Sequence, residues 1–152
     1  WGRGNGWVLL SGADLLAALP PTDPRRPAVL TSFQRLANAL ITQQAAAGLW
    51  PTVVDHPDFY REVSGSALIA AGLTDGLAKG WLGSRRFAEP AQRARYAVWA
   101  QVNADGVVDG VSGPTGPMEN VDWYNQVPAG VYQSYGQGIL LRMAAAEIAA
   151  GQ

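Results

Sequence analysis

Helical periodicity is the feature that most constrains this fold, because the sequence alternates between two kinds of helical segment. Three segments are apolar on nearly every side, as buried helices are: about residues 5–19, 64–81 and 136–150. Two others, about residues 24–47 and 90–103, carry a single apolar stripe, as helices of an outer layer do. The order predicts alternating inner and outer helices of an α/α toroid. Five helices do not close a toroid of six hairpins, so the chain is expected to be an incomplete one.

Proline, aspartate and glycine mark the expected ends of these segments. Pro20 and Pro21 should end the first one, Asp23 should cap the second, and Gly48 should end that second helix. The segments between helices are then a connector over residues 49–60, a turn at Asp105-Gly106, a short hairpin beginning at Val107-Val108, and a loop from Gly110 to Val131.

Small residues open all three apolar segments, at Gly4, Gly65 and Gly136. Helix N-termini expose free N–H groups and partial positive charge. If the three ends converge, glycine would let a ligand approach the backbone, and a carboxylate-bearing sugar would be favoured there. The alternative is that these glycines only permit close packing of the inner helices, and their positions alone favour neither interpretation.

Composition narrows the functional class. Charged residues make up only 15% of the chain, the net charge is −1 and no basic run exists, which argues against a nucleic-acid partner. No uninterrupted apolar stretch predicts a membrane span. Cysteine is absent and His56 is the single histidine, which excludes a zinc site of the usual kind. The six tryptophans suit a saccharide cleft, although each one taken singly is more often a core residue.

Residues 1–7 (WGRGNGW) resemble the W-x-R-G-N-(G/A)-W motif of glycoside hydrolase family 105, the unsaturated rhamnogalacturonyl hydrolases. Asn5 favours this family over the related family 88 unsaturated glucuronyl hydrolases, which usually carry Gln there. The resemblance covers nearly the whole chain. Four further elements agree in order and spacing: Gly48-Leu49-Trp50 followed by Val54-Asp55, Tyr60-x-Glu62-x-Ser64-Gly-Ser66-Ala67, Asp105-Gly106, and Tyr135-Gly-Gln-Gly138.

The resemblance implies an all-α, six-hairpin (α/α)6 barrel, of which residues 1–152 would be the incomplete C-terminal part of a single domain. It implies release of a 4,5-unsaturated uronic acid from the non-reducing end of oligosaccharides that lyases produce from rhamnogalacturonan or pectin. In that reaction an acidic residue protonates the C4=C5 vinyl ether, water adds at C5 and the hemiketal opens. The family needs no metal or organic cofactor.

The resemblance also suggests substrate-binding residues. Trp1, Arg3 and Trp7 match positions that bind the unsaturated sugar in the family, and Ser134 and Tyr135 are further candidates where the last helix opens. An arginine can pair with a carboxylate through two hydrogen bonds, and a tryptophan face can pack on a flat sugar ring. The family's catalytic Asp lies upstream of the W-x-R-G motif and has no match here, so the catalytic residue is unknown. The chain alone is expected to be inactive.

Four polar residues need a separate interpretation. Glu62, Ser64 and Ser66 precede or open an apolar helix, where a capping role is favoured over catalysis. Asp14 is unusual inside an apolar segment, and it should either be paired or face the end of a cavity.

Three functional classes remain for comparison. The first is the C-terminal part of an unsaturated uronyl hydrolase, with an oligosaccharide substrate and with the missing N-terminal part of the barrel as its partner. The second is a non-catalytic saccharide-binding fragment of such a barrel. The third, a sugar isomerase on a related toroid, is disfavoured because such enzymes use histidines for proton transfer and this chain has only His56. The sequence leaves the cellular compartment and the kind of uronic acid open.

Overall fold

Five α-helices form the molecule, and the computed structural model describes residues 1–130 and 133–151. Two short strands pair antiparallel between the second and third helices, and a 3-10 helix lies in the long loop before the last one. The elements are α1 (Gly2–Ala18), α2 (Arg26–Thr42), β1 (Trp50–Pro51), β2 (Arg61–Glu62), α3 (Val63–Ala78), α4 (Ser84–Trp99), the 3-10 helix Val121–Gln126, and α5 (Ser134–Ala149).

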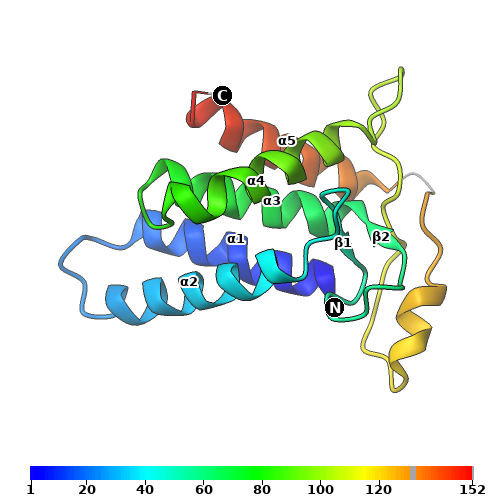
Figure 1. Ribbon diagram of the computed structural model, residues 1–152, viewed down its shortest axis with the longest axis horizontal. Helices are drawn as coiled ribbons and strands as arrows, with labels where there is room; N and C mark the ends of the chain where they lie inside the picture. Colours follow the sequence, from blue (N-terminus) through cyan, green and yellow to red (C-terminus); the bar gives the residue numbers. More distant parts are fainter. Residues whose placement is uncertain (131–132, 152) are drawn as a thin grey trace.

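The helices are arranged as the alternation predicts. Helices α1, α3 and α5 form an inner row in which α3 contacts both neighbours, while α2 packs on α1 and α4 packs on α3. The inner helices run in one direction, so their N-terminal ends lie together at the end of the molecule that also holds β1 and β2 (Figure 1). The outer helices run the opposite way (Figure 1). The expected all-α architecture of inner and outer helices is confirmed.

Small residues bring α1 and α3 unusually close. A Cβ on Gly6 would lie 2.7 Å from Leu68 Cβ and 2.9 Å from the Gly65 carbonyl oxygen, and a Cβ on Gly65 would lie 2.8 Å from the Arg3 amide nitrogen. Gly136 similarly faces the side chain of Val111. Close packing, the second interpretation of the glycine-rich helix starts, therefore accounts for Gly65 and Gly136.

The prediction of three buried helices holds fully only for α3, of which 13 residues are buried. Helices α1 and α5 are apolar all round, but each buries only one side. Val8 on α1 is 64% exposed, and Leu141 and Ile148 on α5 are 69% and 77% exposed. The physical reason is that α3 has neighbours on both sides, whereas no described element covers the far flanks of α1 and α5.

The two largest errors in the predicted helix boundaries concern the start of α4 and the end of α2. Helix α4 begins at Ser84 rather than Pro90, because the buried side chain of Phe87 anchors a turn that precedes Pro90, which lies inside the helix. Helix α2 ends at Thr42, before the predicted residue 47, and a tight turn follows in which Gly48 adopts a φ of 99°.

The connecting segments agree more closely with expectation. The predicted connector contains β1, which pairs with β2 at its far end. Val102 and Val108 form an antiparallel bridge around the Gly106 turn, consistent with a short hairpin. Val131, the end of the predicted loop, lies outside the described residues. Within the described ranges, no helix combines the length and apolar character needed to cross a bilayer.

Candidate functional site

Ser112 joins the N-terminal ends of the three inner helices. Its carbonyl oxygen accepts a hydrogen bond from Arg3 Nη2 of α1 at 2.9 Å and another from the Tyr135 hydroxyl of α5. Its amide donates to Glu62 Oε1, directly before α3, at 3.0 Å. The Arg3 guanidinium also contacts the Ser112 hydroxyl. One loop residue thus fixes the relative positions of three helix ends.

Glu62 is the N-cap of α3 and is only 1% exposed. Its carboxylate accepts from the Ser64 amide at 3.2 Å, the Ser64 hydroxyl at 2.8 Å and the Gly65 amide at 2.6 Å. Its Oε1 also lies 3.7 Å from Arg3 Nη2. A negative charge at a helix N-terminus satisfies free N–H groups and complements the helix dipole. The predicted capping role of Glu62 is confirmed.

The Arg3 guanidinium lies between two aromatic rings. Its Cζ is 5.2 Å from the Trp1 ring centroid and 4.9 Å from that of Tyr135, within cation–π range. Arg3 is only 6% exposed. Its Nε and the Trp1 Nε1 are buried donors that meet no acceptor within the described part of the chain. The Glu62 carboxylate, 3.7 Å from Arg3 Nη2, balances the charge of the guanidinium in this cluster of Trp1, Arg3, Glu62 and Tyr135.

A cleft of about 390 Å³ runs along the inner row next to this cluster. Its size is that of a small-ligand site. Trp7 of α1 and Tyr135 of α5 give it an aromatic wall, and Asp14 and Arg142 stand at its other end. Apolar and small side chains lie between them: Leu10, Leu68, Gly138 and Ile139. An apolar surface with polar groups at the end is the combination that sugars require, because a sugar ring has C–H faces and a hydroxyl rim.

The charged end of the cleft ties α5 to both other inner helices. Arg142 Nη2 donates to Asp14 Oδ1 of α1 at 2.9 Å and to Asp75 Oδ2 of α3 at 2.6 Å. Burial opposes the charged form of Arg142, but hydrogen bonds to Asp75 and then Asp14 outweigh it and raise the pKa of the guanidinium. Asp14 is therefore both paired and at the end of a cavity, as expected.

The structure places only two of the five predicted substrate-binding residues in the cleft. Trp7 and Tyr135 share the cleft. Arg3 is buried behind the Tyr135 ring, and Trp1 lines a separate hollow between α1 and α2. Ser134 is exposed at the first position of α5, beside Tyr135.

Sequence reasoning missed Ser112 and Arg142. Ser112 lies in a segment predicted only as loop, and nothing in its local sequence distinguishes it from other loop serines. Arg142 had a weak signal, since it is the one basic residue of the apolar helix α5, as Asp14 is the one acidic residue of α1. The two become a recognisable pair once α1 and α5 are known to flank α3.

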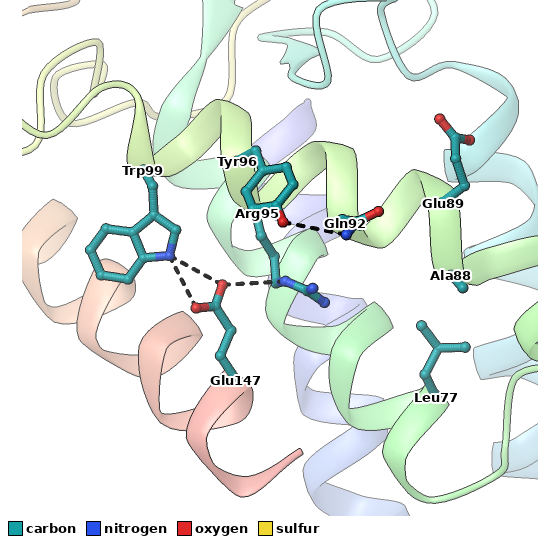
Figure 2. Close-up of a pocket in the computed structure, with 8 residues that line it drawn as sticks. All are labelled: Leu77, Ala88, Glu89, Gln92, Arg95, Tyr96, Trp99 and Glu147. Atoms are coloured by element: carbon teal, nitrogen blue, oxygen red, sulfur yellow. Dashed lines mark hydrogen bonds and ion pairs between the residues drawn. The ribbon is translucent and has the colours of Figure 1, made fainter. Parts of the chain in front are cut away.

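A second, larger groove of about 600 Å³ lies between α4 and α5. Figure 2 shows that its polar groups face one another: Trp99 Nε1 donates to Glu147, and Arg95 Nε lies 3.4 Å from Glu147 Oε1. It contains none of the predicted binding residues. The cleft along the inner row is therefore the better candidate site.

Fold and cleft define an all-α domain of inner and outer helices with an aromatic, polar-ended cleft along its inner row. Residues 1–150 match the model of the family described as Glycosyl Hydrolase Family 88. The chain belongs to this family, which confirms the resemblance seen in the sequence.

Individual relatives agree. The chain is 37% identical over 141 residues to an unsaturated rhamnogalacturonyl hydrolase, YesR, of Bacillus subtilis, covering 93% of this chain and 39% of the relative. It is 33% identical over 113 residues to an unsaturated 3S-rhamnoglycuronyl hydrolase of Alteromonas, covering 73% of this chain and 27% of the relative. The chain thus spans well under half the length of these relatives.

Solved structures confirm the fold. A possible member of family 105 from Salmonella enterica superposes with a TM-score of 0.90 at 27% identity, over 99% of this chain and 40% of that one. A similar protein from Klebsiella pneumoniae gives 0.90 at 28% identity, over 99% and 39%. The fold is that of the (α/α)6-barrel enzymes of families 105 and 88.

Proposed function

We propose that a protein containing this chain releases 4,5-unsaturated uronic acid from the non-reducing end of lyase-generated oligosaccharides of the rhamnogalacturonan or pectin type. In this proposal residues 1–152 are the C-terminal part of a single barrel domain, and the rest of that barrel is the partner that completes the site. The observation that carries it is the aromatic cleft at the shared N-terminal end of the inner helices, where the W-x-R-G-N-G-W motif also falls. The names of the relatives support the substrate class.

The predicted binding residues take two roles in this proposal. Trp7 and Tyr135 pack against the faces of the sugar, and Ser134 offers a hydroxyl at the entrance. Arg3 supplies positive charge close to the Tyr135 ring and contacts the Trp1 ring as well. The sugar carboxylate is favoured at this end, because Arg3 and the positive ends of the α1 and α5 dipoles lie there.

The general acid is expected from residues outside this chain. Asp14 is the one carboxylate that lines the cleft within the described residues, and it is paired with Arg142. We therefore assign it no proton-transfer role. If no acid is supplied from elsewhere, the same cleft is a non-catalytic saccharide-binding site, which is the second candidate function.

One assay separates the two functions. Hydration of the conjugated double bond abolishes its ultraviolet absorbance, so an unsaturated rhamnogalacturonan disaccharide is incubated with the 152-residue chain and with a longer protein that contains it. We expect loss of absorbance with the longer protein only. Turnover by the 152-residue chain would contradict the missing acid. Binding without turnover by both proteins would favour the second function.

A further inference from the structure

The inner end of the cleft carries hydrogen-bonding groups that the fold does not use. Arg142 commits Nη2 to both Asp14 and Asp75, and among the described residues no hydrogen bond uses its Nη1 or Nε. Asp14 likewise uses only Oδ1, and its side chain is 61% exposed. The cleft therefore ends in a forked donor beside a carboxylate acceptor, both reached from the same cavity.

Charge decides which ligand group this end accepts. Two carboxylates, Asp14 and Asp75, surround one guanidinium, so the local net charge is −1. A third carboxylate from a uronic acid would be repelled here, because like charges a few Å apart interact strongly in a partly desolvated site. Neutral hydroxyls suit it, since each one both donates and accepts. Two adjacent hydroxyls can accept from the Arg142 fork and donate to Asp14 Oδ2.

We propose that Arg142 and Asp14 form a subsite for a vicinal diol of the bound saccharide, and that this subsite fixes the direction of the sugar in the cleft. Its carboxylate end then lies toward Arg3 and Tyr135, and its hydroxyl end lies toward Arg142. Asp75, on the third inner helix, holds the guanidinium in place from behind. This inference rests on the proposed saccharide function and adds the orientation of the ligand.

The test uses a longer protein that contains this chain, with Asp14→Asn as the main variant. The probes are a saturated uronyl disaccharide, which cannot undergo vinyl-ether hydration, and its neutral methyl ester, with Kd measured by calorimetry. The asparagine side chain keeps the shape but loses the charged acceptor, so both probes should bind about tenfold more weakly. Arg142→Lys, which keeps the charge and loses the fork, should weaken both to a similar extent. Asp105→Asn, in an exposed turn, is the matched control and should change neither Kd.

Each other outcome overturns part of the scheme. Unchanged Kd values for both probes in Asp14→Asn would remove the diol subsite while leaving the proposed function intact. Tighter binding of the charged probe alone would show that the carboxylate lies at the Asp14 end, and would reverse the orientation. If the unsubstituted protein binds neither probe, this inference fails, while loss of absorbance with the unsaturated disaccharide still tests the proposed function separately. Circular dichroism spectra of the variants establish that each one folds.

Discussion

Glu62 is the buried acceptor at the centre of the polar network beside the cleft. It accepts hydrogen bonds from two residues of α3 and from Ser112, and it faces Arg3. Glu62→Gln keeps the shape but turns one acceptor oxygen into an NH2 group that faces donors. The buried donors left unpaired should cost about 2–3 kcal/mol of unfolding free energy, measured by urea denaturation. Glu89→Gln, whose side chain is 71% exposed, should change it by less than about 0.5 kcal/mol. A loss as small as that in Glu62→Gln would contradict the capping role.

Asp23 gives a prediction about pH. Its carboxylate accepts hydrogen bonds from the guanidinium of Arg25 and, with a smaller effect, from the Arg25 amide, and these lower its pKa from 3.8 to about 2. Because the folded pKa is depressed, its contribution to stability is present above pH 3.8 and is lost as the pH falls through about 2. The side-chain carbonyl carbon of Asp23 should therefore titrate near pH 2 by NMR. In Arg25→Gln the midpoint should move toward 3.8, and an unmoved midpoint would refute the assignment to Arg25.

At the scale of elements, the contact between α1 and α3 depends on glycine. In Gly6→Ala the new methyl group meets Leu68 Cβ and the Gly65 carbonyl, so the helices must separate. The unfolding free energy should fall by about 1–3 kcal/mol. Gly138→Ala is the opposite case, because a Cβ there meets nothing within 4 Å and the residue lies in α5. Alanine's helix propensity should raise stability by about 0.5–1 kcal/mol. Equal effects at the two positions would contradict the close packing.

The elements that could be predicted are those whose sequence signal lies within the element itself. Apolar periodicity located all five helices, because burial against neighbouring helices imposes that pattern on the sequence. The start of α4 was misplaced, since proline is usually found in a first turn, and the burial of Phe87 that extends the helix depends on tertiary contacts. The strands β1 and β2, two residues each, are too short for any alternation to appear.

In the candidate site, the residues with a local sequence signal were predicted, whereas contacts between distant parts of the chain were not. Trp7 and Tyr135 were found because they belong to a motif and to a helix start. The network around Ser112 and the pairing of Asp14 with Arg142 were not, because residues 3 and 112, and residues 14 and 142, lie more than 100 positions apart. Only the parallel arrangement of the inner helices brings them together. The burial of Arg3 likewise follows from Tyr135 and Ser112, which its own segment does not contain.

The exposed flanks of the inner row determine how the 152-residue chain behaves in solution. Val8 on α1 and Leu141 and Ile148 on α5 are large apolar side chains exposed by 64%, 69% and 77%. Removing such apolar surface from water stabilises an association by about 25 cal/mol per Å² of buried area. The isolated chain should therefore self-associate, and its sedimentation coefficient should rise with concentration. A longer protein that covers these flanks with further barrel helices should not show that rise.

Substitutions test whether the flanks of the inner row, rather than any exposed apolar side chain, drive this association. The double variant Val8→Lys, Leu141→Lys places charge on both flanks, and it should shift the 152-residue chain toward the monomer. Tyr96→Lys is the matched control, because Tyr96 is a 65% exposed aromatic side chain on the outer helix α4 rather than on α1 or α5. It should leave association unchanged. If Tyr96→Lys dissociates the chain and the double variant does not, the α4 surface drives association, and the flanks of the inner row do not need covering by the rest of a barrel.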